Sequence, residues 1–203
     1  MNPLDSFGRP ALATAEFVIV VAAATAFASG ASRWGGALLI VAGGLALIQA
    51  RVARPAGRVS SFGALYEALI ARAGEAVLCG GIALFFLRGG IAPERVTLAV
   101  MIAITALALA LLAAYARARA EGLGVEARAG IPPVLAQVAL LGVVPLVLGP
   151  GLLIWMTLAF AVTSAVTLLY RVIHVARAAA PGTGITGRKR DTLPGRGALR
   201  RGN

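Results

Sequence analysis

Charged side chains interrupt one long apolar stretch of the sequence. Glu67, Arg72 and Glu75 lie among residues that would otherwise form an ordinary membrane-spanning helix. A charge at the centre of such a helix costs roughly 2.5–3.5 kcal/mol, and less near the membrane interface. Arg72 and Glu75 are three residues apart, so we predict that they meet on one helix surface. Glu67, Ala71 and Glu75 follow at intervals of four and are predicted to form one stripe.

The preceding connection offers partners for this stripe. Arg51 and Arg54 are the candidates to neutralise Glu67. The alternative is that all of these charges lie at the membrane interface and extend to water. Carboxylate oxygens are the ligands that hard divalent cations prefer. This segment is therefore where the sequence could hold a metal ion.

The composition excludes several classes of protein. The chain has 203 residues, of which 59% are hydrophobic and 13% charged, and its mean hydropathy is +0.87. Soluble domains usually carry about a quarter charged residues, so an integral membrane protein is indicated. One cysteine, Cys79, and one histidine, His174, leave zinc, haem and iron–sulfur sites without ligands. The net charge of +11 is explained by membrane topology, and no nucleic acid partner is expected.

Six apolar runs are long enough to cross a hydrocarbon layer of about 30 Å. The predicted fold class is all-α, a polytopic membrane protein with six transmembrane helices. The turn Gly149-Pro150-Gly151 is predicted to join the last two helices in a tight hairpin. The six runs are Ala11–Ser29, Trp34–Gln49, Ala64–Leu87, Pro93–Ala114, Pro132–Leu148 and Leu152–Val175.

Basic residues gather on one side of these runs, which predicts a cell-membrane protein with both termini in the cytoplasm. Residues 1–180 are predicted to form the transmembrane domain. Residues 181–203 are Gly-rich and basic, and are predicted to be a flexible cytoplasmic tail. Abundant Ala and Gly in the spans predict close helix packing and a dimer. Membrane lipids are the expected partners.

Three blocks of sequence carry a family resemblance. Ala53-Arg54, followed eight residues later by Gly63, fits the pattern D-x2-D-G-x2-A-R-x8-G-x3-D-x3-D of the CDP-alcohol phosphatidyltransferases. The block Tyr115–Ile131 is similar to a segment of the phosphatidylglycerophosphate and phosphatidylinositol-phosphate synthase branches, and Tyr170–Arg177 resembles the end of the family's C-terminal helix. The resemblance implies that family's helical bundle and a role in phospholipid biosynthesis, where the family transfers a phosphatidyl group from a CDP-linked lipid to an alcohol.

The four family aspartates are replaced in this chain, by Ala46, Gln49, Glu67 and Ala71. In the family they hold two divalent cations on the CDP diphosphate, and the last is proposed to deprotonate the alcohol. One carboxylate and one amide cannot replace four carboxylates around Mg²⁺. We therefore predict impaired catalysis, no metal site and no cofactor, which makes the chain a candidate pseudoenzyme.

The remnants of the substrate and nucleotide site that the resemblance implies are Ala53, Arg54, Gly63 and Glu67, with Glu67 as the candidate catalytic residue. Related synthases carry a basic cluster for the phosphate of the acceptor where this chain has Pro132–Gln137, which argues against a phosphorylated acceptor.

Two other interpretations stay open. One is a divergent active transferase that uses Glu67, Gln49 and Glu75 with Mg²⁺ or Mn²⁺ and CDP-diacylglycerol. The other is a non-enzymatic scaffold subunit of the membrane. In the leading interpretation the chain forms a homodimer, or a heterodimer with an active relative whose function it supports.

Overall fold

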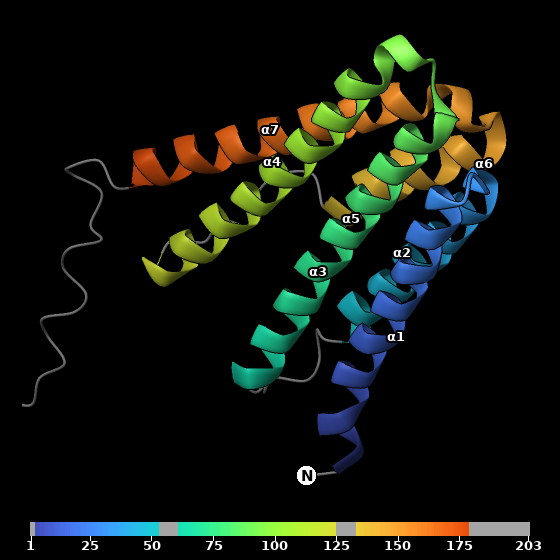
Figure 1. Cartoon of the computed structure of the whole chain (residues 1–203). Coiled ribbons are helices and arrows are strands. Elements are labelled where there is room, and N and C mark those ends of the chain that lie inside the picture. The colour runs from blue at the N-terminus through green and yellow to red at the C-terminus, as the bar shows by residue number, and fades with distance from the viewer. Residues whose placement is uncertain (1–2, 53–60, 125–132, 179–203) are drawn as a thin grey trace, which may run out of the picture.

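The computed structural model describes residues 3–52, 61–124 and 133–178, and they form helices joined by short turns, with no strand among them. Figure 1 shows the chain from its N-terminal helix to its C-terminal helix. The long helices are α1 (Pro3–Ala28), α2 (Ser32–Val52), α3 (Ser61–Phe85), α4 (Val96–Gly122) and α7 (Leu153–Ala178). The shorter elements are η1 (Phe86–Gly90), η2 (Pro93–Arg95), α5 (Pro133–Gln137), η3 (Val138–Val143), α6 (Val144–Leu148) and η4 (Pro150–Leu152).

Five of the six predicted spans are confirmed as helices long and apolar enough to cross a membrane. The run predicted at Pro132–Leu148 is described from Pro133 onward as the broken helix α5–η3–α6. The π-helix η3 interrupts its regular winding, and Gly149, with φ 79°, ends it at the predicted tight turn.

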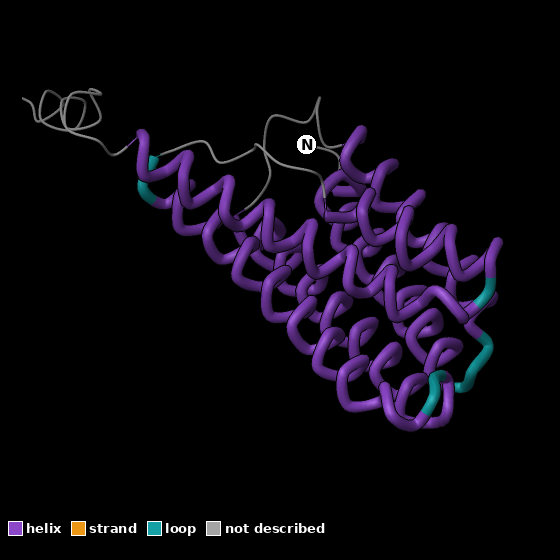
Figure 2. Tube along the Cα trace, turned by 90° about the horizontal axis from the view of Figure 1, so that it is seen from above, coloured by secondary structure: helices purple, strands orange, loops and turns teal. Residues whose placement is uncertain are grey.

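The helices form two groups that meet along α3. α1 packs against both α2 and α3, while α4 packs against α7, and α3 also contacts α4. In Figure 1, α4 and α7 lie side by side and extend away from the group of α1, α2 and α3. The broken helix α5–η3–α6 packs against α2. Figure 2 shows the turns that join the described helices to one another, in teal, gathered at one end of the bundle.

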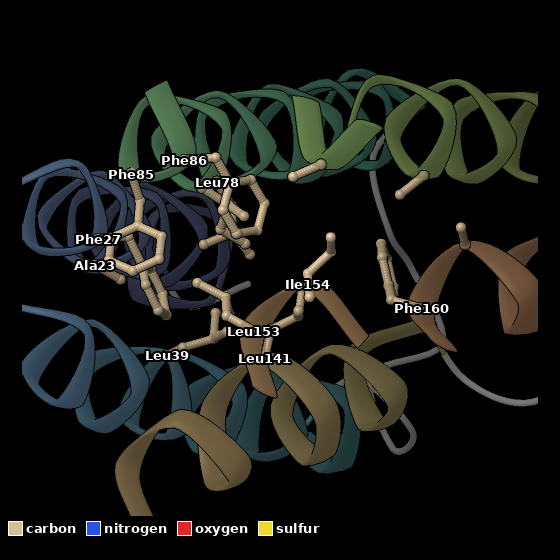
Figure 3. Packing of buried hydrophobic residues seen from close by; sticks show 14 of the residues in the cluster. Ala23, Phe27, Leu39, Leu78, Phe85, Phe86, Leu141, Leu153, Ile154 and Phe160 are labelled. Atoms are coloured by element: carbon tan, nitrogen blue, oxygen red, sulfur yellow. The ribbon is translucent and has the colours of Figure 1, made fainter. Parts of the chain in front are cut away.

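The hydrophobic core sits where these groups meet. Figure 3 shows Phe27 of α1, Leu78 of α3 and Phe86 of η1 close to Leu141 of η3 and Leu153 of α7. Each of these five side chains is almost completely buried. Large apolar side chains elsewhere face outward, as expected of helices that are surrounded by lipid.

Glycine allows the closest approach between helices. A side chain at Gly81 of α3 would meet the backbone of Ala24 in α1, and one at Gly36 of α2 would meet the carbonyl oxygen of Gly142 in η3. Small residues at such crossings let helix backbones pack in lipid without voids. The cavity described next therefore has walls held together by close backbone contacts.

Candidate functional site

A cavity of about 290 Å³ opens between α1, α2, α3 and the end of α5. Its walls are mostly apolar, but six polar side chains reach it. Figure 1 shows α1, α2 and α3, which provide most of its lining, side by side. The polar lining residues are Glu16, Gln49, Glu67, Arg72, Glu75 and Gln137.

The four positions that the resemblance assigns to the family aspartates all line this cavity. Ala46 and Gln49 come from α2, and Glu67 and Ala71 come from α3. Of the implied remnants, Gly63 lies on α3 one turn before Glu67. Ala53 and Arg54 lie outside the described residues. The packing of the bundle thus brings together four positions that belong to two separate helices.

Glu16 is a polar residue of the cavity that the sequence pattern did not single out. It lies on α1, and its Oε2 accepts a hydrogen bond of 2.8 Å from the Gln49 amide nitrogen, Nε2. Both side chains are half-buried. A carboxylate inside the first apolar run was the available signal, but only the packing of α1 against α2 shows which residue it faces.

The predicted pair of Arg72 and Glu75 is confirmed. The Arg72 Nη1 donates to Glu75 Oε2 at 2.7 Å, and Glu75 is 6% exposed while Arg72 is 32% exposed. A buried carboxylate needs such a partner, because leaving its charge unpaired in an apolar environment is costly. Arg72 therefore anchors Glu75 in the wall of the cavity and partly cancels its charge.

The oxygen donors of this cavity do not fit two divalent cations. Two of the four implied ligand positions are alanine, a third is the uncharged amide of Gln49, and Glu75 is paired with Arg72. Among the described residues, no group of three His, Cys, Asp or Glu side chains could hold a metal ion. Mg²⁺ requires several oxygen ligands in near-octahedral geometry, which these donors do not supply.

Gln137 is a second residue that the sequence pattern did not single out. It ends α5, directly before the π-helix η3, and lines the cavity. Its amide nitrogen is buried and has no hydrogen-bond partner in the part of the chain that the structure describes. The sequence indicated only that the segment Pro132–Gln137 lacks the basic cluster of the related synthases.

The α4–α7 pair carries a buried arginine. Arg171 is 5% exposed, and its Nη1 donates to the carbonyl oxygen of Ala113 at 2.5 Å, while its Nε has no partner among the described residues. Arg117 pairs with Glu121 at 2.9 Å on the exposed side of α4. The buried guanidinium of Arg171 thus links α7 to α4 through the carbonyl oxygen of Ala113.

Two aromatic residues, Tyr66 and His174, stack on a neighbouring ring of the same helix. Tyr66 shares a hydrogen bond of 2.9 Å with Thr14 and stacks on Phe62, so its hydroxyl links α3 to α1. His174 is half-buried and stacks on Tyr170 with ring centroids 6.3 Å apart. Cys79 is buried, as expected of a small core residue.

The fold is similar to that of phosphatidylinositol phosphate synthase from Mycobacterium tuberculosis. Against its structure with CDP-DAG bound, the TM-score is 0.67 at 20% identity, over 86% of this chain and 88% of that one. Its complex with manganese and citrate gives a TM-score of 0.68 at 20% identity, over 86% of this chain and 84% of that one. Its apo form gives 0.68 at 21% identity, over 86% and 91% of the two chains.

Sequence comparisons add no further relative. No protein-family model matches the chain, and no curated protein does so. The family resemblance that the sequence indicated is thus confirmed at the level of the fold, and the predicted all-α class is confirmed with five helices long and apolar enough to cross a membrane.

Proposed function

We propose that this chain is a phosphatidyltransferase-like membrane protein of phospholipid biosynthesis that does not carry out metal-dependent phosphatidyl transfer. It keeps the bundle and the cavity but lacks the oxygen donors that two divalent cations need. Its role is then to bind a lipid, or to support an active relative as a partner subunit.

One observation carries this proposal. Ala46, Gln49, Glu67 and Ala71 converge on one cavity, so their replacement affects a single site rather than four unrelated positions. Ala46 and Ala71 offer no ligand atom and no base. When the diphosphate of a CDP-linked lipid is cleaved, metal ions neutralise the charge on it and on the CMP that leaves, and without a carboxylate at position 71 the attacking alcohol has no base there.

The orientation and partners complete the proposal. With both termini in the cytoplasm, Gln49 and Glu67 of the cavity lie near the cytoplasmic ends of α2 and α3, where lipid headgroups lie. A homodimer, or a heterodimer with an active relative, remains the expected assembly.

The test is a transfer assay on the purified protein. CDP-diacylglycerol is supplied with Mg²⁺ or Mn²⁺ and a panel of alcohols, and release of CMP is measured, with the mycobacterial synthase as the positive control. We expect no CMP above the protein-free background. CMP release that depends on the metal and is lost in Glu67→Gln would overturn the proposal.

A divergent active transferase is the second candidate. The observation in its favour is that three carboxylates, those of Glu16, Glu67 and Glu75, line the cavity together. A single cation held by Glu67 and Gln49 would give binding of CDP-diacylglycerol that depends on Mg²⁺ or Mn²⁺. Calorimetry with and without the metal separates the two candidates, because only this one predicts a difference.

A further inference from the structure

Glu16 differs from the other acids of the cavity in its partner. Glu75 is paired with the guanidinium of Arg72, and Glu67 makes an interaction of its own. Glu16 is hydrogen-bonded to the uncharged amide of Gln49, and no cation pairs with it in the described ranges 3–52, 61–124 and 133–178. Its carboxylate therefore brings a negative charge into the cavity that no described side chain cancels.

The place of this charge matters. Glu16 Oε2 lies 2.8 Å from the side chain at position 49, which the resemblance gives to a metal-binding aspartate beside the donor diphosphate. Metal ions would make that position attractive to phosphate, whereas Glu16 makes it repulsive. The cavity is partly enclosed by apolar residues such as Phe17, Val20 and Leu39, so water screens this repulsion less than it would at a surface.

The amide at position 49 and the acid at position 16 also depend on each other. An aspartate at position 49 would bring a second carboxylate close to that of Glu16, and two such carboxylates cannot both stay ionised at low cost. Gln49 instead donates a hydrogen bond to Glu16. The amide thus stabilises the acid in the position where it faces the cavity.

We propose that Glu16 is the specificity-determining residue of this cavity. Its carboxylate excludes diphosphate ligands, and the cavity binds lipids whose polar group carries no negative charge. This inference rests on the proposed function, in that it takes the cavity to be the site that faces a lipid ligand. The inference adds that the cavity selects against CDP-diacylglycerol, the lipid bound by the mycobacterial synthase. This selection comes from Glu16 on α1, and the family positions on α2 and α3 do not provide it.

The test compares two lipids that differ in charge and share their acyl chains. Binding of short-chain CDP-diacylglycerol and of the matching diacylglycerol is measured by thermophoresis on the full-length protein, in EDTA. Glu16→Gln keeps the size of the side chain and a hydrogen bond to position 49 but removes the charge. We expect it to tighten binding of CDP-diacylglycerol by about tenfold, as expected for removing one like charge from a partly buried site, and to leave diacylglycerol unchanged.

Two further variants make the result decisive. Glu94→Gln makes the same chemical change at an exposed residue of η2, outside the cavity, and should change neither affinity. Glu16→Met removes the charge and introduces no amide. It replaces Glu16→Gln in the binding measurement if that variant does not fold. No tightening in the folded Glu16 variants, or equal tightening for both lipids, overturns the inference. Metal-dependent CMP release by the wild type would instead overturn the proposed function, whatever the EDTA measurement gives.

Discussion

The carboxylate of Glu16 and the amide of Gln49 face each other between α1 and α2, with Oε2 and Nε2 2.8 Å apart. This contact joins a residue of the first span to a position that the resemblance assigns to a metal ligand. A second hydrogen bond between side chains, shared by the hydroxyls of Thr14 and Tyr66, joins α1 to α3. Polar contacts thus fix α1 against both of the helices that carry the family positions.

Changing Gln49 to Asp should destabilise the protein. The variant replaces a hydrogen bond by two carboxylates in close contact, and we expect the free energy of unfolding to fall by about 2 kcal/mol at neutral pH. Thermal unfolding of the detergent-purified protein measures the effect. The double variant Glu16→Gln, Gln49→Asp should recover most of the loss, because the amide can then donate from position 16. Equal loss in the single and double variants would mean that the two side chains do not interact.

Breaking the Arg72–Glu75 pair should cost more than breaking the Arg117–Glu121 pair. Arg72→Ala leaves a nearly buried carboxylate unpaired, and we expect a loss of about 2–4 kcal/mol. Arg117→Ala breaks a pair whose side chains are 47% and 48% exposed, so the expected loss is about 0–1 kcal/mol. Urea or thermal unfolding of both variants under one set of conditions compares them. Similar losses would show that the Arg72 pair is solvated.

The sequence predicted the fold well because its signals are local. The lengths of the apolar runs predicted the five long helices, and Gly149-Pro150 predicted the turn before α7. The spacing of Arg72 and Glu75 gave their pairing, since a helix fixes which residues three apart can meet. The π-helical winding of η3 inside the predicted run Pro132–Leu148 was missed, because apolar content does not distinguish a π-helix from an α-helix.

The candidate site was predicted only in part, because its contacts join distant parts of the chain. The family pattern placed Ala46, Gln49, Glu67 and Ala71 in one site, and all four line the cavity. Nothing local to Glu16 shows that it faces Gln49, 33 residues away. The burial of Arg171 against Ala113, 58 residues away, likewise depends on how α4 packs against α7.

Two neighbouring glycines of α3 offer a matched test of packing between α1 and α3. A side chain at Gly81 would collide with the backbone of Ala24, whereas one at Gly80 would meet nothing within 4 Å. Gly81→Leu should therefore lower the free energy of unfolding by about 3 kcal/mol or more, since overpacking here must separate two helices. Gly80→Leu should be neutral or stabilising, because leucine is the better helix former. Thermal unfolding compares the two variants, and equal effects would contradict the close α1–α3 crossing.

Restoring the aspartates on the Glu16→Gln background should create a metal site. The triple variant Ala46→Asp, Gln49→Asp, Ala71→Asp supplies, with Glu67, four carboxylates around the cavity, which suits divalent cations. In the presence of Glu16, however, the new carboxylate at position 49 faces a fifth carboxylate at close range. We expect Mn²⁺, followed by electron paramagnetic resonance, to bind the triple variant on the Glu16→Gln background about tenfold more tightly than the wild type, because oxygen-ligand number governs affinity for hard cations. In the triple variant with native Glu16, the carboxylates at positions 16 and 49 repel each other. We expect this variant to have a lower thermal stability than the wild type when no metal is present. Equal Mn²⁺ affinity in the wild type and the restored variant would show that missing carboxylates are not what limits metal binding in this cavity.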